Sequence, residues 1–446
     1  MVANKKKKRL SPMLKIVLCF IGIILAGGLL LKLPICINKG QTLSWIDSFF
    51  TSCSAVCVTG LCPINPGLVF TKFGQCILAL LIQIGGIGFV TFAVFVMIML
   101  GAKIGINDRS LLKEALNQNS NQGLVKLVIK IIITTLVIEF AGSIINFIVF
   151  IQDMPFLDAV HHSVFLSISA FCNAGFDILG LGNSLESYSG NILLNINIML
   201  LIFLGGLGFI VITDILKKKR WKRFSIHTKV VLIMSITLII SGTLLIKLSQ
   251  SLSENNITWL QALFQSVTCR TAGFSTVQLS SLTSFTIIIM CGLMFVGASP
   301  CSTGGGIKTT TLFVMCRSIQ GFSIGKTSTA FKRKISSSTK IKAFTLTTIA
   351  VLSIFAFSAI IAFIEQFNPN PVEFTQIIFE TISAFGTVGL SMNLTPILLA
   401  PSKILLCFLM FLGRIGALTI FSMWNQKWNA PTKSYVDYVE EKFIIG

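Results

Sequence analysis

Val58-Thr59-Gly60-Leu61 is the stretch that decides the fold, because the chain repeats it in nearly the same form three more times. Each copy has a small or polar pair, one glycine and a bulky apolar residue. The other copies are Asn173-Ala174-Gly175-Phe176, Thr271-Ala272-Gly273-Phe274 and Thr387-Val388-Gly389-Leu390. One such tetrapeptide arises easily by chance in a glycine-rich apolar chain. Four copies in register inside a repeated unit indicate an internal repeat.

The segment before each copy also repeats. A Ser-Ala pair stands six and five positions before the glycine in three copies, as Ser54-Ala55, Ser169-Ala170 and Ser383-Ala384, while the third copy has Val267-Thr268 there. Further upstream, a polar residue marks the start of a short amphipathic helix: Asp47, Asp158, Gln261 and Gln376. Helices this short end at membrane depth, which is tolerable only where the backbone faces protein or water. Four such loops around one axis can present rings of backbone carbonyls that replace a cation's hydration shell.

Composition indicates an integral membrane protein. The 446 residues are 53% hydrophobic and 12% charged, and the mean hydropathy is +0.85. These values exclude a soluble enzyme. Apolar runs near the roughly 20 residues that cross a bilayer recur throughout. We expect them at about 14–33, 70–100, 124–150, 191–216, 229–248, 283–298, 342–366 and 403–424. The expected fold is an all-α polytopic membrane protein.

The distribution of charge predicts the orientation in the membrane. The net charge of +20 gathers in Lys5–Arg9, Lys217–Lys229 and Arg317–Lys342, which are alternate connecting segments. This alternation follows the positive-inside rule and places these loops and both termini in the cytoplasm. Basic cytoplasmic rims attract anionic lipid as readily as protein. We expect a multi-pass protein of the cell membrane with no nucleic-acid partner.

The repeats divide the chain into six segments. Each repeat has an outer helix, a pore helix, a filter loop and an inner helix, arranged around a central pore. The segments are a basic cytoplasmic N-terminus (1–13), repeat 1 (14–100), repeat 2 (101–216), repeat 3 (217–315), repeat 4 (316–424) and a cytoplasmic C-terminal tail (425–446).

The inner helix of repeat 3 is expected to break inside the membrane. No regular helix survives Pro300 closely followed by three consecutive glycines, and too few residues precede this point to cross the bilayer. Broken helices at mid-membrane mark transport sites. We therefore favour an intramembrane loop below the filter over an ordinary loop, and expect it to be the only break among the four inner helices. The predicted gate comprises Gly297, Ala298, Ser299, Pro300, Ser302, Thr303, Gly304, Gly305 and Gly306, with Lys308 and Arg414.

Two arginines lie at membrane depth. Arg414 in Gly413-Arg414-Ile415-Gly416 occupies the place of the second glycine in Gly85-Gly86-Ile87-Gly88 and Gly205-Gly206-Leu207-Gly208. Small residues let helices approach closely. A lone arginine there is costly, so we expect Arg414 to bond free carbonyls of the broken helix. Arg270, directly before the third filter, is expected to bond carbonyls behind it.

These features together resemble the Trk/Ktr/HKT superfamily of potassium transporters, and most of all its KtrB-type membrane subunits. The resemblance covers nearly the whole chain and includes Tyr438-Val439-Glu440-Glu441-Lys442 near its end. It implies potassium uptake through a channel-like pore, with potassium as the only metal. The ions would be held mainly by the backbone of Val58, Thr59, Gly60, Asn173, Ala174, Gly175, Thr271, Ala272, Gly273, Thr387, Val388 and Gly389.

The resemblance also implies partners. It predicts a homodimer in which each subunit has its own pore, resting on a cytosolic KtrA-type regulatory ring that binds ATP/ADP or NAD(H). Nucleotide is expected on that partner, and no covalent cofactor on this chain. Sodium stays open as an activator. One departure follows the fourth filter, where a glycine-containing turn is replaced by Ser391-Met392-Asn393-Leu394-Thr395-Pro396. Asn393 can take the positive φ that this turn needs.

Two other functions fit the sequence less well. A membrane enzyme needs several ionisable groups at one depth, but the acids are spread over the repeats as Asp47, Glu139, Asp158, Glu365 and Glu380. The glycines before Lys308-Thr309 do not match a P-loop. The closest alternative is a sodium-permeable or weakly selective monovalent cation transporter of the same fold, because each filter has one glycine where potassium channels have two.

Overall fold

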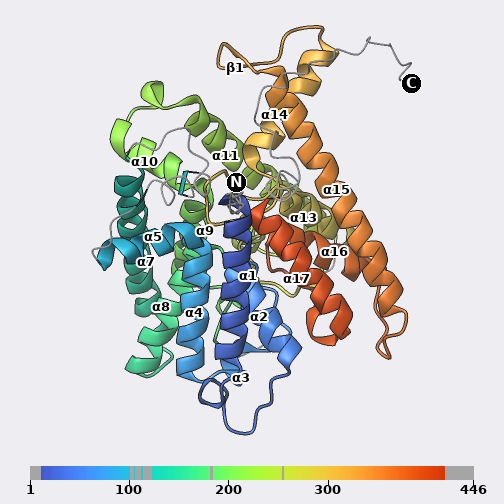
Figure 1. Ribbon diagram of the computed structural model, residues 1–446. Coiled ribbons are helices and arrows are strands. Elements are labelled where there is room, and N and C mark those ends of the chain that lie inside the picture. Colours follow the sequence, from blue (N-terminus) through green and yellow to red (C-terminus); the bar gives the residue numbers. More distant parts are fainter. Residues whose placement is uncertain are drawn as a thin grey trace, which may run out of the picture.

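The computed structural model describes residues 12–100, 105, 112–113, 123–180, 184–253 and 256–416. Helices dominate this part of the chain (Figure 1). One small antiparallel hairpin, formed by β1 (Thr329–Ala330) and β2 (Arg333–Lys334), projects at the end of the molecule where α14 lies. Residues 1–11 of the expected basic N-terminus and the whole expected C-terminal tail lie outside the described residues.

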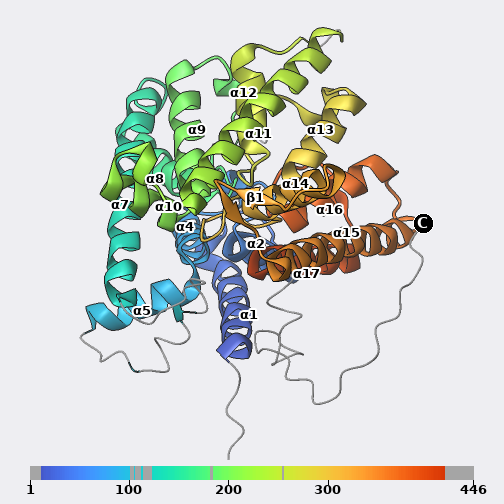
Figure 2. The ribbon, with the colours of Figure 1, turned by 90° about the horizontal axis from the view of Figure 1, so that it is seen from above.

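The same order of helices occurs four times: a long helix, a shorter helix, a loop and a third helix. The first set is α1 (Pro12–Leu31), α2 (Trp45–Cys57) and α4 (Lys72–Ile87). The second is α7 (Leu124–Phe150), α8 (Phe156–Cys172) and α9 (Ile192–Leu207). The third is α11 (Ile226–Ser251), α12 (Trp259–Thr268) and α13 (Ser284–Phe295), and the fourth is α15 (Ser337–Glu365), α16 (Phe374–Gly386) and α17 (Ala400–Ile415). Seen from above, the four sets follow one another around the molecule in chain order (Figure 2).

Shorter elements occupy the connections. After the filters lie α3 (Pro66–Val69) and the 3-10 turns Glu186–Tyr188, Leu279–Ser281 and Thr395–Ile397. Another 3-10 turn, Pro34–Cys36, follows α1, and Trp221–Arg223 precedes α11. Three helices extend the inner helices: α5 (Phe89–Met99), α10 (Phe209–Lys218) and α14 (Thr309–Ser323).

Polar residues start the four short helices as the sequence predicts. Asp47, Asp158, Gln261 and Gln376 each occupy the third helical position. Gln261 forms a capping box in which its amide N–H donates to the Thr258 hydroxyl (3.2 Å) and its side chain accepts from the Thr258 N–H (2.8 Å). Such boxes satisfy backbone donors that a helix start leaves free. The short helices are central, because each contributes a fully buried phenylalanine: Phe50, Phe171, Phe264 and Phe379.

The inner helices differ from the sequence prediction. The runs 70–100 and 191–216 were expected to be continuous, yet α4 and α5 meet at 105° and α9 and α10 at 97°. The expectation that only the third inner helix breaks is therefore wrong. The bends fall at Gly88 and Gly208, both with φ of 89°, and Gly416 after α17 has the same φ. A Cβ disfavours this conformation, so the last glycine of each G-x-x-G motif ends a regular helix.

The first glycine of each motif serves close packing, but against the short helix of its own set rather than between inner helices as the sequence predicts. A Cβ on Gly85 would collide with the carbonyl of Val56, and Gly205 and Gly413 face the carbonyls of Phe171 and Phe385 in the same way. These carbonyls belong to the ends of the short helices. The small residues thus bring each inner helix onto the short helix of its own set.

The outer surface suits a lipid environment. By length and composition, three described helices could cross a membrane, namely Leu14–Leu31 within α1, α11 and α15, and counting each bent pair as one span raises this to five. Phe355 and Phe363 on α15 are 73% and 62% exposed. Because large apolar side chains face outward along a spanning helix, the surrounding solvent is lipid rather than water.

A candidate ion filter and the loop beneath it

The four filter loops share an unusual backbone. In three sets the residue directly after the short helix has a positive φ, namely Val58 (57°), Asn173 (61°) and Thr387 (50°). In the third set the corresponding residue is Thr271 (73°), three positions after the end of α12. The filter glycines follow with φ of 101°, 68°, 84° and 92° at Gly60, Gly175, Gly273 and Gly389. A positive φ is costly for valine and threonine, and such strain persists only where surrounding structure imposes it.

The amides of the loops bond back to the short helices. The N–H of Thr59 donates to the Ser54 carbonyl (2.8 Å), and the N–H of Gly60 donates to the Ser54 hydroxyl (3.0 Å). The fourth loop repeats both bonds from Val388 and Gly389 to Ser383 (2.8 and 3.1 Å). In a trans peptide the preceding carbonyl points opposite to the N–H. The carbonyls of residues 58–59 and 387–388 therefore point away from their helices.

The third loop is one residue shorter than the other three, whereas the sequence repeat predicts four loops of equal length. Val267 was placed opposite the serines, but Thr268 takes their role: its carbonyl accepts from the Ala272 N–H (2.9 Å) and its hydroxyl donates to the Phe274 carbonyl (2.6 Å). Ser169 makes the matching bond to Phe176 (2.7 Å). The anchoring hydroxyl thus lies five residues before Gly273 rather than six.

The four loops form a closed ring. A Cβ on Gly175 would lie 2.7 Å from the Ala272 carbonyl oxygen, and one on Gly273 would lie 2.5 Å from that of Val388. Gly60 abuts the carbonyl of Ala174, and Gly389 abuts that of Thr59 in the same manner. Each filter glycine thus contacts the next loop in chain order, and the fourth returns to the first. Only glycine fits this close approach.

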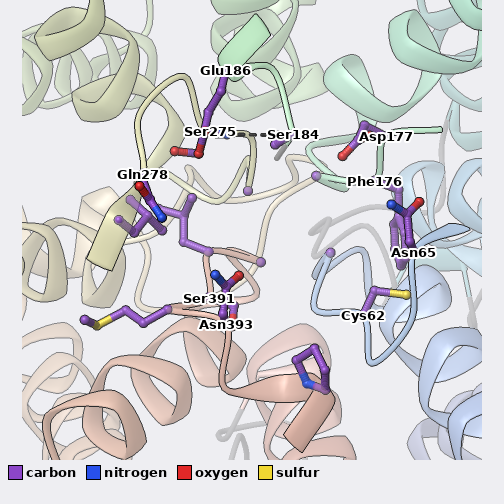
Figure 3. Close-up of a pocket in the computed structure, with 18 of the residues that line it drawn as sticks. Cys62, Asn65, Phe176, Asp177, Ser184, Glu186, Ser275, Gln278, Ser391 and Asn393 are labelled. Carbon is purple, nitrogen blue, oxygen red and sulfur yellow. Dashed lines mark hydrogen bonds between the residues drawn. The ribbon is translucent and has the colours of Figure 1, made fainter. Parts of the chain in front are cut away.

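A cavity of about 290 Å³ opens on one side of the ring (Figure 3). The four filter glycines form its floor, and its walls include the acids Asp177 and Glu186. Burial raises the pKa of Asp177 to about 6. A mouth lined by acids and polar groups attracts cations and repels anions.

The segment between α13 and α14 lies on the other side of the ring. Val296 and Ile307 pair as a parallel bridge and close the segment into a loop. The amides of Ser299 and Thr303 donate to the carbonyls of Gly206 (3.1 Å) and Gly205 (3.3 Å), and the amide of Gly306 donates to that of Gly413 (3.3 Å). The loop is therefore held by the glycine motifs of the second and fourth sets.

The loop also touches the filter itself. The amide of Gly305 donates to the Thr387 hydroxyl (2.9 Å), and the Thr303 hydroxyl donates to the Phe171 carbonyl (3.3 Å). Gly304 packs against the side chain of Thr271. Ala298, Ser299 and Thr303 are fully buried. This position is directly beneath the ring, and the remaining predicted gate residues Gly297, Pro300 and Ser302 lie in the same loop.

Two cations bond the loop's carbonyls. The Arg414 guanidinium donates to the carbonyl of Thr303, which confirms the prediction that it bonds the broken helix. It also donates to the carbonyls of Gly85 and, at 3.3 Å, Gly86, a contact that the sequence did not predict. The Lys308 ammonium donates to Gly304 (2.7 Å) and Gly305 (3.3 Å) within the loop.

Arg270 lies elsewhere. Its guanidinium donates to the carbonyl (3.3 Å) and hydroxyl (3.2 Å) of Ser235 on α11. This contact confirms the expectation that Arg270 bonds a carbonyl behind the filter, and the carbonyl is that of Ser235 on the outer helix α11.

Comparison with known proteins decides the family. The family model described as TrkH, cation transport protein, matches residues 23–427. The chain belongs to the TrkH family of cation transport proteins. The Ktr system potassium uptake protein B of Bacillus subtilis (strain 168) is 39% identical over 423 residues, covering 93% of each chain. The potassium/sodium uptake protein NtpJ of Enterococcus hirae is 36% identical over 99% of both chains.

A solved structure has the same fold. The crystal structure of the potassium transporter TrkH from Vibrio parahaemolyticus superposes with a TM-score of 0.72 at 17% identity, over 95% of this chain and 87% of that chain. This likeness shows a mainly helical fold, and the family match, the sequence relatives and the apolar helices together identify the chain as a multi-pass membrane transporter.

Within the described residues of this TrkH-family chain, no cluster of three His, Cys, Asp or Glu side chains could hold a metal ion. The oxygens that the ring offers are backbone carbonyls, which suit a monovalent cation. Two acids named from the sequence, Glu139 and Glu380, are buried, and the sequence patterns assign them no role in the site. Glu139 accepts from Gln83 (3.0 Å), and Glu380 accepts from Ser391 (3.1 Å). Their signal was an acid inside an apolar segment, which by default has a partner or a function.

Proposed function

We propose that this chain takes up potassium across the cell membrane through a channel-like pore, with the ring of loops as its selectivity filter. The observation that carries the proposal is the closed ring, in which every filter glycine abuts a carbonyl of the next loop. Potassium would be held by the backbone of 58–60, 173–175, 271–273 and 387–389. Relatives at 35–39% identity are named potassium uptake proteins, which supports the same cargo here.

In this proposal the four sets of helices are helix–pore-loop–helix repeats with the boundaries predicted above. The short helices point their C-terminal ends at the ring, where their partial negative charge favours cations. The acidic cavity and the ring would then act one after the other on an entering ion. The cavity concentrates the ion, and the carbonyls of the ring replace its water.

The loop 297–306, with Lys308 and Arg414, is the proposed gate. A carbonyl filter conducts whenever both ends are open, so controlled uptake needs a second barrier. The loop's position beneath the ring, its contacts to Thr271 and Thr387, and its many hydrogen bonds to other repeats support this role. Glycines and short polar side chains allow it to change conformation at modest cost.

Regulation by a partner is also proposed. The subunit would form a homodimer, with cytoplasmic termini, on a cytosolic KtrA-type ring that binds ATP/ADP or NAD(H), so the nucleotide would sit on the partner. Two basic connecting segments support a shared cytoplasmic face, because the Lys229 ammonium lies 5.7 Å from the ring of Phe331. The exposed hairpin residues Lys332, Arg333 and Lys334 offer positive charge to an acidic partner or to anionic lipid.

A sodium-permeable or weakly selective transporter is the second candidate. The relative NtpJ is named a potassium/sodium uptake protein, and each filter here has a single glycine. Sodium would in either case remain open as an activator.

Uptake of rubidium into proteoliposomes separates the two candidates. The purified chain is reconstituted with a potassium gradient, and external potassium or sodium competes with tracer rubidium. Empty liposomes and a Gly273→Ser chain serve as controls. A selective pore predicts that potassium competes at far lower concentration than sodium. Equal competition favours the second candidate, and absence of uptake by the wild-type chain even with its cytosolic partner bound refutes both.

A further inference from the structure

A recurring contact braces the filter from behind. In each short helix, one residue lies three positions before the anchoring hydroxyl: Thr51, Leu166, Gln265 and Glu380. In each loop, one residue lies two positions after the filter glycine: Cys62, Asp177, Ser275 and Ser391. The second group surrounds the cavity outside the ring, one residue from each set (Figure 3).

Three of the four sets join these two positions. Thr51 Oγ1 lies 3.7 Å from Cys62 Sγ in the first set, and Gln265 Nε2 donates to Ser275 Oγ at 3.0 Å in the third. In the fourth, Ser391 Oγ donates to Glu380 Oε1 at 3.1 Å. In these three sets the loop is therefore tied to its short helix both before and after the filter glycine.

The second set lacks the brace. Leu166 is apolar and offers no hydrogen bond, and the carboxylate of Asp177 instead accepts from the Leu179 amide at 3.2 Å. The chain thus contains its own example of a loop without this side-chain contact, held after its glycine by the bond from Ser169 to the Phe176 carbonyl (2.7 Å).

Glu380 makes the most extensive brace. It is 1% exposed, and besides Ser391 it accepts a hydrogen bond from the Thr395 hydroxyl. Ser391 Oγ in turn accepts from the Leu394 amide (3.3 Å). Asn393, between them, has a φ of 61°, as the sequence predicted. One buried side chain thus holds both ends of the turn that replaces the expected glycine-containing one.

We propose that Glu380 is a positioning residue that fixes the outer mouth of the fourth filter loop and thereby contributes to the discrimination between potassium and sodium. The inference rests on the proposed function. Gly389 is anchored on one side by Ser383 and on the other, through Ser391, by Glu380. With both anchors the carbonyls keep the spacing that a large ion needs. Without the outer anchor the loop can close around the smaller sodium ion.

Substitutions that copy the other sets test this role. Glu380→Gln introduces the residue of the third set and keeps an oxygen that accepts from Ser391. Glu380→Leu introduces the residue of the second set and removes the brace. Glu365→Leu is the matched control, because Glu365 is also a buried acid (5% exposed), yet it accepts from the Leu399 amide (3.1 Å) at the start of α17, away from the filter. The measurements are protein yield, maximal rubidium uptake and the ratio of the half-competing sodium and potassium concentrations.

Glu380→Leu should lower this ratio about tenfold, because it removes hydrogen bonds to a charged group. Glu380→Gln should restore it to within about twofold, and Glu365→Leu should leave it unchanged. If Glu380→Leu does not fold, Ser391→Ala removes one donor and should lower the ratio several-fold. A wild-type ratio in a folded Glu380→Leu chain overturns this inference but leaves the proposed function standing. If Ser391→Ala has to be used instead, a wild-type ratio in that variant has the same meaning. A wild-type chain without rubidium uptake even with its cytosolic partner bound overturns the proposed function with it.

Discussion

Arg414→Ala should open the proposed gate. The substitution deletes the guanidinium bonds to Thr303, Gly85 and Gly86. Of these carbonyls only that of Thr303 belongs to the loop, so one charged hydrogen bond is lost from the closed arrangement. The other two join Arg414 to the first inner helix, and their loss weakens the framework without directly freeing the loop.

The size of the effect follows from that single bond. A hydrogen bond to a charged group contributes about 1.5–3 kcal/mol. At about 1.4 kcal/mol per tenfold, the ratio of open to closed pores should rise by roughly 10- to 150-fold. The bonds of Ser299 to Gly206 and of Gly305 to Thr387 remain, so the flux should stay below that of an unobstructed pore. Deleting Ser302–Gly306 removes more of these bonds and should raise flux further.

Rubidium uptake in proteoliposomes, with and without the cytosolic partner, measures both basal flux and regulation. Arg270→Ala is the matched control: it removes another buried guanidinium, but one that bonds Ser235 on α11. It should lower the melting temperature without raising flux. The preference for potassium over sodium should be unchanged in all three variants, because none alters a filter residue or the contact between Glu380 and Ser391.

Two results would refute the reasoning. A folded Ser302–Gly306 deletion whose flux stays low and fully regulated would remove the loop from consideration as the gate. Arg270→Ala that raises flux as much as Arg414→Ala would attribute the effect to general loosening of the helices.

Three further predictions concern the filter, the partner and the fold. Gly273→Ser and Gly389→Ser should each weaken potassium uptake at least tenfold while reducing protein yield far less, because a Cβ meets a neighbouring carbonyl and a positive φ at both positions; unchanged potassium affinity and ion preference would exclude the filter assignment. Alanine at Lys332–Lys334 should reduce co-purification with the cytosolic partner several-fold at low salt, whereas binding that survives these changes would place the contact elsewhere. Asp214→Ala removes an ion pair with Lys218 (2.6 Å) and two bonds to the start of α11, and should lower the free energy of unfolding by about 1–3 kcal/mol, measured as a melting temperature in detergent; an unchanged melting temperature would contradict this.

Local chemistry determined much of the fold from the sequence alone. The short helices begin where polar residues such as Gln261 and Gln376 can cap them, because capping depends on residues three positions apart. The filter glycines were recognisable because positive φ selects glycine at a fixed place in each repeat. The break after α13 was recognisable because Pro300 and the nearby glycines oppose a helix whatever surrounds them.

Tertiary contacts decided what these local rules leave open. The motif Gly205-Gly206-Leu207-Gly208 is compatible with a straight helix, and it bends because Gly208 must let the chain pass the carbonyl of Pro300. Thr268 rather than Val267 anchors the third loop, because the position of the loop in the ring brings the Phe274 carbonyl within reach of the Thr268 hydroxyl. The Arg414 guanidinium meets carbonyls of residues 85, 86 and 303, and Glu380 meets Ser391, only when the chain has folded. Such pairings depend on where distant segments meet in space, which the propensity of each residue does not encode.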